Sequence, residues 1–97
     1  MKQGFVYILA SHKNGSLYIG VTSDLAPRIW QHKNKVFKGH TSRYDIDKLV
    51  YYETFDDMDD AIKREKILKD WDRTWKKDLI EKTNPEWNDL YESIIWK

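Results

Sequence analysis

The sequence predicts an α/β protein of the α+β, sandwich-like kind, in which a small three-stranded sheet is flanked by helices in the order β-β-α-β-α-α-α. Three observations lead to this prediction. The chain has 97 residues, a length that builds one hydrophobic core, so residues 1–97 are expected to form a single domain. Its first two β-rich runs flank an Asn14-Gly15 pair, the strongest short signal for a hairpin. Capped segments of helical period fill most of the second half.

Each predicted strand is a run rich in β-branched and aromatic side chains, and the three runs cover residues 5–9, 17–21 and 49–55. A two-residue turn at Asn14-Gly15 would place Tyr18 opposite Ser11 and Tyr7 opposite Thr22. Because side chains alternate along a strand, Tyr7 and Tyr18 are expected on one face of the hairpin, roughly 13 Å apart. A longer loop would bring them directly opposite each other on that face. Packing residues with a wet hydroxyl are the simpler interpretation of this pair.

Capping residues set the expected helix boundaries. Thr22, Ser23 or Asp24 can cap a first helix that has Pro27 in its first turn and runs to about residue 35. Asp56 or Asp57 can cap a second helix that ends near residue 69, and a third helix is expected over residues 73–82. Asn84 followed by Pro85 is expected to open a short last helix, because proline is favoured in the first turn.

Composition excludes several classes of protein. The chain has no Cys, so it has neither a disulfide framework nor a thiolate zinc site, which is typical of intracellular proteins. The longest apolar run, residues 5–10, is far shorter than the roughly 20 residues of a membrane span. The N-terminal residues show no secretory pattern. We therefore expect a cytoplasmic protein with no membrane partner.

The distribution of charge indicates a nucleic-acid partner, although the formal net charge is only +1. The stretch between Pro27 and Tyr44 contains no acid, and its cations are Arg28, Lys33, Lys35, Lys38 and Arg43. Such a stretch can neutralise phosphates, which assigns Lys33, Lys35, Lys38 and Arg43 to nucleic-acid binding. An ordinary solvated helix and loop would give the same pattern, so both interpretations stay open at this point.

Arg28, His32 and Glu65 are the side chains best placed for chemistry. Arg28 and His32 are spaced i, i+4 on one face of the first helix, where a forked guanidinium can hold a phosphate oxygen. Glu65 stands in the apolar stripe of the second helix, which is unfavourable for a carboxylate unless it is paired or bound to metal. The alternatives are a surface arginine beside a surface histidine, a buried ion pair of Glu65, for example with Arg28, and a helix rolled so that Glu65 reaches water.

Together these features resemble the GIY-YIG nuclease superfamily, and most closely its short, stand-alone, single-domain bacterial members. The resemblance rests on Phe5-Val6-Tyr7, Tyr18-Ile19-Gly20, Arg28, His32 and Glu65, and it extends through residues 64–71 and 84–87. It therefore covers essentially the whole chain. The first triad keeps only its tyrosine, and the later asparagine of many members has no clean counterpart, with Asn84 as the nearest candidate.

The resemblance implies a metal-dependent endonuclease that acts on nucleic acid, DNA rather than RNA, with DNA repair as a typical setting. It implies that Tyr7 or Tyr18 helps to deprotonate the attacking water and that His32 assists. Arg28 would stabilise charge at the scissile phosphate, and Glu65 would bind a single divalent cation, Mg²⁺ or Mn²⁺. The sequence does not distinguish which tyrosine is the base.

Two other hypotheses stay open. The chain could be a nucleic-acid-binding module of the same fold with little or no catalysis. Alternatively, Tyr7, Tyr18 and Glu65 could serve packing and a buried ion pair. The presence of Arg28 and His32 together with these three favours the enzyme, because a binding module could lose Glu65 freely.

Overall fold

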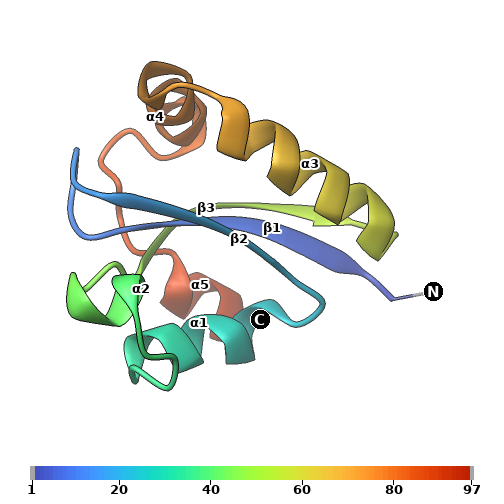
Figure 1. Cartoon of the computed structure of the whole chain (residues 1–97), viewed down its shortest axis with the longest axis horizontal. Coiled ribbons are helices and arrows are strands. Elements are labelled where there is room, and N and C mark those ends of the chain that lie inside the picture. Colours follow the sequence, from blue (N-terminus) through green and yellow to red (C-terminus); the bar gives the residue numbers. More distant parts are fainter. Residues whose placement is uncertain (1, 97) are drawn as a thin grey trace.

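A three-stranded antiparallel sheet lies between two layers of helices in this computed structural model, which describes residues 2–96 (Figure 1). The strands are β1 (Gly4–Ala10), β2 (Leu17–Thr22) and β3 (Lys48–Phe55). Their order in the sheet is β2-β1-β3, so β1 is central and β2 forms an edge. The predicted fold class is confirmed, and each predicted strand is present with an extra residue at one or both ends.

The helices divide between the two faces of the sheet. One layer holds α1 (Leu25–Lys33), α2 (His40–Arg43) and α5 (Tyr91–Ile95), and the other holds α3 (Met58–Asp70) and α4 (Arg73–Thr83) (Figure 1). The helices expected near residues 25–35, 58–69 and 73–82 are therefore present as α1, α3 and α4. Within residues 2–96, none of the helices has the length and apolarity needed to cross a membrane.

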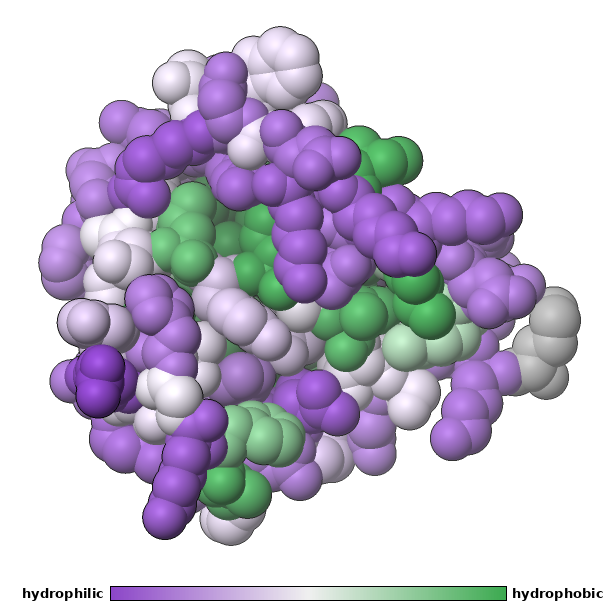
Figure 2. Space-filling view, viewed as in Figure 1, coloured by the Kyte–Doolittle hydropathy of each residue, from purple (hydrophilic) through white to green (hydrophobic). Residues whose placement is uncertain are grey.

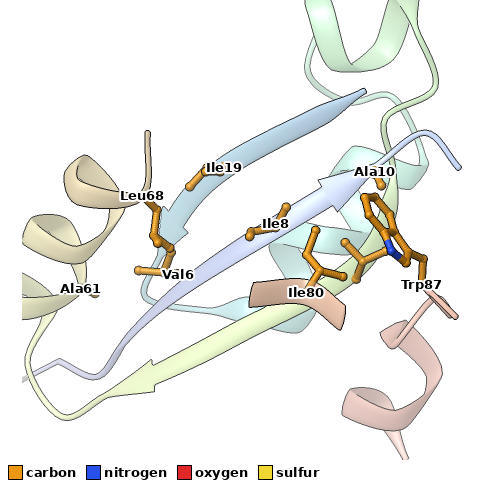
Figure 3. Packing of buried hydrophobic residues seen from close by; sticks show 9 residues of the cluster. Val6, Ile8, Ala10, Ile19, Ala61, Leu68, Ile80 and Trp87 are labelled. Atoms are coloured by element: carbon orange, nitrogen blue, oxygen red, sulfur yellow. The ribbon is translucent and has the colours of Figure 1, made fainter. Parts of the chain in front are cut away.

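Alternation along β1 supplies two hydrophobic cores, one on each face. Val6 and Ile8 point toward α3 and α4, where they pack with Ile80 and other apolar residues (Figure 3). Tyr7 and Leu9 point toward the layer of α1. All four β1 side chains are at most 1% exposed, and full burial of such side chains stabilises a fold by about 1.5–3 kcal/mol each. On the face in Figure 2, apolar groups form a broken row across the middle of the molecule, and hydrophilic side chains cover most of the rest.

The hairpin register differs from the prediction. Tyr7 lies opposite Gly20 and Tyr18 opposite Leu9, so the predicted two-residue turn is wrong. The loop closes instead between Ser11 and Ser16, whose backbone N–H and C=O bond at 3.1 Å. Arg73 of α4 holds this wider loop by donating to the carbonyls of Asn14 and Gly15, at 2.8 and 2.6 Å.

Two helices also differ from the prediction. Only α2 was not predicted, because its four residues are too short to show a helical period. The last helix starts at Tyr91 and not at Asn84, which is the C-cap residue of α4. Pro85 thus follows a helix end, where proline is also common.

Asn84 ties the segment after α4 to the sheet. It is 5% exposed, and its amide nitrogen donates to the carbonyls of Val50 (3.0 Å) and Asn88 (2.9 Å). Its amide oxygen accepts from the backbone N–H of Asn88 at 3.0 Å. These bonds use every polar atom of the side chain, so Asn84 has a structural role.

Replacing Asn84 with alanine is expected to lower the free energy of unfolding by about 2–4 kcal/mol, because it strands the buried carbonyl of Val50, which costs about 1–3 kcal/mol, and removes two further hydrogen bonds to the backbone of Asn88. Urea denaturation measures the loss. The matched control is Asn88→Ala, which removes an exposed amide side chain and leaves the backbone bonds in place. Equal stability of the two variants would contradict the structural role of Asn84.

Candidate functional site

The ring of Tyr7 lies across the edge strand of the sheet. Its partner on β2 is Gly20, and a Cβ atom built at Gly20 would stand 2.4 Å from the Tyr7 Cζ and hydroxyl oxygen. Only a hydrogen fits between them, so this glycine is what lets the phenol lie flat over β2. Gly20 had no predicted role of its own, although a glycine inside a strand signals such a close approach.

Gly20→Ala is expected to displace the Tyr7 ring and to destabilise the fold by about 1–3 kcal/mol, the usual range for overpacking. Thermal unfolding measures this loss. In a Tyr7→Leu background the same substitution meets a smaller side chain, so its effect should shrink by half or more in a double-mutant cycle. An equal effect in both backgrounds would show that the clash is not with Tyr7.

Tyr7 and His32 form a buried hydrogen-bonded pair. The Tyr7 hydroxyl lies 3.1 Å from His32 Nε2, and His32 Nδ1 lies 3.4 Å from the Thr41 hydroxyl. Burial, and then the positive charge of Arg28, lowers the pKa of His32 below its ordinary value. Burial, and then Tyr18, raises the pKa of Tyr7 to about 12, which Arg28 partly opposes. Both members of the pair are therefore neutral at pH 7.

A pocket of about 300 Å³ opens beside this pair. The rings of Tyr7 and Tyr18 are 6.3 Å apart, and those of Tyr18 and His32 are 5.5 Å apart. The Arg28 guanidinium lies over the Phe37 ring at 5.3 Å. The lining residues include two cations and no acid: Tyr18, Arg28, His32, Phe37, Lys38, His40 and Thr41. The cationic side chains in this lining suit the pocket to an anion such as a phosphate group.

Glu65 comes from α3, in the helix layer opposite α1, and it does not line this pocket. Its side chain is only 13% exposed, and its carboxylate pairs with Lys69 at 2.9 Å. The charges of Glu65 and Lys69 nevertheless interact electrostatically with the two tyrosines. Glu65 adds to the effect of burial on the pKa of Tyr7. The hydrogen bond that Lys69 donates to Glu65 raises the pKa of Lys69, and Tyr18 adds to this effect.

The structure thus gathers four of the five predicted residues directly, namely Tyr7, Tyr18, Arg28 and His32. Glu65 comes from α3 in the opposite helix layer, and its charge makes the smallest of the contributions to the raised pKa of Tyr7. Its ion-pair partner is Lys69 and not the arginine that we offered as an example.

The four predicted nucleic-acid-binding cations fall into two groups. Lys33 pairs with Asp89, and Lys35 pairs with Asp45. Lys38 lines both the pocket above and a second one of about 580 Å³, which Arg43 lines as well. Within the part of the chain that the structure describes, neither Lys38 nor Arg43 takes part in an ion pair.

Comparison with known proteins gives one consistent result. Residues 3–78 match the model of the GIY-YIG catalytic domain. A UPF0213 protein of Staphylococcus saprophyticus is 38% identical over 80 residues, which are 82% of this chain and 96% of that protein. A UPF0213 protein of Clostridium perfringens is 40% identical over 76 residues, which are 78% and 81% of the two chains.

A solved structure agrees with the sequence relatives. The solution NMR structure of a UPF0213 protein from Bacillus halodurans superposes with a TM-score of 0.56 at 26% identity, and it covers 93% of this chain and 95% of that one. The family resemblance read from the motifs is thereby confirmed.

Proposed function

This chain belongs to the GIY-YIG catalytic domain family, and we propose that it is a metal-dependent endonuclease that hydrolyses phosphodiester bonds in nucleic acid, DNA in preference to RNA. A nuclease-type function follows from the family itself. The observation that carries the finer proposal is the anion-accepting pocket, in which Arg28 lies beside the neutral Tyr7–His32 pair. Phosphodiester hydrolysis needs both a phosphate ligand and a route for the proton of water.

In the proposed mechanism Arg28 binds the scissile phosphate and neutralises the charge that develops on its oxygens. Tyr18, on the wall of the same pocket, orients the phosphate and the attacking water. Arg28 is suited to this role because its fork can bond two oxygens at once. The aromatic side of the pocket, where Phe37 lies against the guanidinium, holds that fork in place.

Tyr7 and His32 would move the proton together. With a pKa of about 12, Tyr7 is only about one part in 100,000 phenolate at pH 7, so a stored phenolate is not the base. Instead, water passes its proton to the Tyr7 oxygen while the Tyr7 proton moves to His32 Nε2. The hydroxide forms a bond to phosphorus as the bond to the leaving oxygen breaks. This route uses the tautomer in which His32 Nδ1 carries a proton and donates to Thr41.

Glu65 fits a single hydrated cation. Among residues 2–96 no group of three or more His, Asp or Glu gathers into a cage. Magnesium needs none, since it usually keeps several waters and uses one or two carboxylates together with phosphate oxygens. Glu65 would be the protein ligand for Mg²⁺ or Mn²⁺, and the bound cation would supply charge stabilisation for the leaving oxygen.

The Glu65–Lys69 ion pair favours one alternative. A carboxylate that already has a counter-ion suits a nucleic-acid-binding module of the same fold with little or no catalysis. Cleavage assays separate the two functions. We would incubate the purified protein with a panel of labelled duplex, branched and single-stranded DNA and RNA, in magnesium, manganese or chelator. The proposal predicts cleavage that needs the metal, and binding without cleavage across the whole panel would establish the alternative.

The nucleic-acid interface is expected to depend on Lys38 and Arg43 more than on Lys33 and Lys35. Each phosphate contact contributes about −0.9 to the log–log salt slope on duplex DNA. The Lys38→Ala/Arg43→Ala double variant should therefore make the slope less steep by roughly 2. Fluorescence anisotropy at several salt concentrations measures it.

The Lys33→Ala/Lys35→Ala double variant is the matched control for this measurement. It removes the same amount of charge, but from side chains that already pair with Asp89 and Asp45. Its slope should change by less than half as much. Equal changes in the two double variants would show that the whole basic stretch contacts the phosphates.

A further inference from the structure

The carboxylate that we assign to the metal already has a cation of its own. Lys69 Nζ lies 2.9 Å from Oε2 of Glu65, and the two residues are spaced i, i+4 on α3. In this order, with the acid before the base, the pair is favourable on a helix. One rigid helix therefore carries both charges, and the ammonium occupies one of the two oxygens of the carboxylate.

The two side chains differ in their freedom to move. The Glu65 side chain is 13% exposed, whereas that of Lys69 is 52% exposed. A lysine has a flexible stem and a strongly hydrated head, so Lys69 can swing into water without any change in α3. Glu65 is packed and stays where it is. Displacing the ammonium is thus the least disruptive way to free the Glu65 carboxylate for a metal ion.

We propose that Lys69 is a resident counter-ion of Glu65 that a divalent cation must displace, so that Lys69 sets the metal concentration at which the site loads. The inference rests on the proposed role of Glu65 as metal ligand. Two cations compete for one partly buried carboxylate, because each repels the other across a few ångströms.

The test is the affinity for Mn²⁺, measured by isothermal titration calorimetry on the full chain. Lys69→Met keeps the length of the side chain and removes its charge. It should bind Mn²⁺ about tenfold more tightly than the wild type, which is the effect of removing one competing charge at a half-exposed position. Lys69→Arg keeps the charge and should bind as the wild type does.

A matched control removes the same charge from the same helix. Lys66 is exposed on α3, and because adjacent helix positions do not face each other, Lys66→Met should leave the Mn²⁺ affinity unchanged. A second readout is thermal unfolding. Added Mn²⁺ should raise the melting temperature of Lys69→Met more than that of the wild type at the same concentration, since stabilisation follows the ratio of ligand to Kd.

An equal or weaker affinity of Lys69→Met would overturn the proposal, because a lysine that merely positions Glu65 would weaken binding when removed. Glu65→Gln separates this failure from failure of the metal assignment. If Glu65→Gln binds Mn²⁺ as the wild type does, Glu65 is not the ligand, and both ideas fall. If binding requires Glu65 but ignores Lys69→Met, only the competition is wrong.

Discussion

Glu65→Gln is expected to slow metal-dependent cleavage by about two to three orders of magnitude while the protein stays folded and still binds nucleic acid. The substitution keeps the size and shape of the side chain but removes the charge that holds a hard divalent cation. Losing the charge stabilisation that such a cation supplies should lower the rate on the order of a hundred- to a thousandfold. Single-turnover cleavage in magnesium measures the rate, and anisotropy measures the retained binding.

The structure also limits what Glu65→Gln can do to stability. Breaking a fully buried ion pair costs about 3–5 kcal/mol. The partner here is Lys69, whose side chain is half exposed and can be rehydrated, so we expect a loss of about 1 kcal/mol or less. Glu86→Gln, in the exposed pair with Lys13, is the control for removing one acid. A large drop in melting temperature with full activity of the folded protein would make Glu65 structural.

Arg28→Ala is expected to reduce the cleavage rate by a similar factor, on the order of a hundred- to a thousandfold. Arg28 lines the pocket beside Tyr18 and His32, where its removal takes away the group that neutralises the phosphate oxygens. Arg28→Lys keeps the charge but loses the fork, so it should recover only part of the rate. Single-turnover rates at saturating protein separate this loss from weaker binding.

The control for Arg28 is Arg43→Ala. Arg43 lines the neighbouring pocket and does not line the one that holds Arg28. Its removal should weaken binding and leave the saturated rate within about a factor of three, because a phosphate contact remote from the reacting atoms is used equally in the ground and transition states. If both arginines lowered the saturated rate equally, Arg28 would have no special part in the chemistry.

The sequence predicted the elements of this fold better than their connections. The helix start at α3 was predicted from a cap, and the Asp57 carboxylate does accept from the backbone N–H of Asp59 at 2.8 Å. The hairpin register was not predictable in the same way. In the structure Arg73, which lies far along the chain, donates to the loop carbonyls of Asn14 and Gly15 and so helps to hold the wider loop. A local turn signal contains no information about such a contact.

The same distinction applies to the candidate site. Alternation placed Tyr7 and Tyr18 on one face, and helical spacing placed Arg28 and His32 together, as the structure has them. The contact between His32 and Tyr7 needed the tertiary packing of α1 on the sheet. Local sequence patterns determine on which face of a strand or helix a side chain lies, whereas the distances between side chains depend on tertiary packing.

The charge distribution along the sequence did not show which cations are paired in the fold. The basic stretch was visible in the sequence, but its division into paired and unpaired cations was not. Lys33 meets Asp89 from the C-terminal segment, and Lys35 meets Asp45 across the α2 turn. The structural role of Asn84 was not predictable either. Its position as the C-cap residue of α4 and its bond to Val50 appear only when β3 lies beside the end of α4. Partners distant in sequence decide which polar groups are free to bind a ligand.

The most direct test of the central claim is the opening of closed circular nucleic acid. A circle has no ends, so only an endonuclease can break it. The account predicts that the wild-type protein opens circular DNA in magnesium or manganese, that chelator stops the reaction, and that Glu65→Gln purified in parallel leaves the circles closed. Cutting that persists in chelator or with the Glu65→Gln protein would contradict this mechanism. So would a wild-type protein that leaves single- and double-stranded circles of DNA and RNA intact.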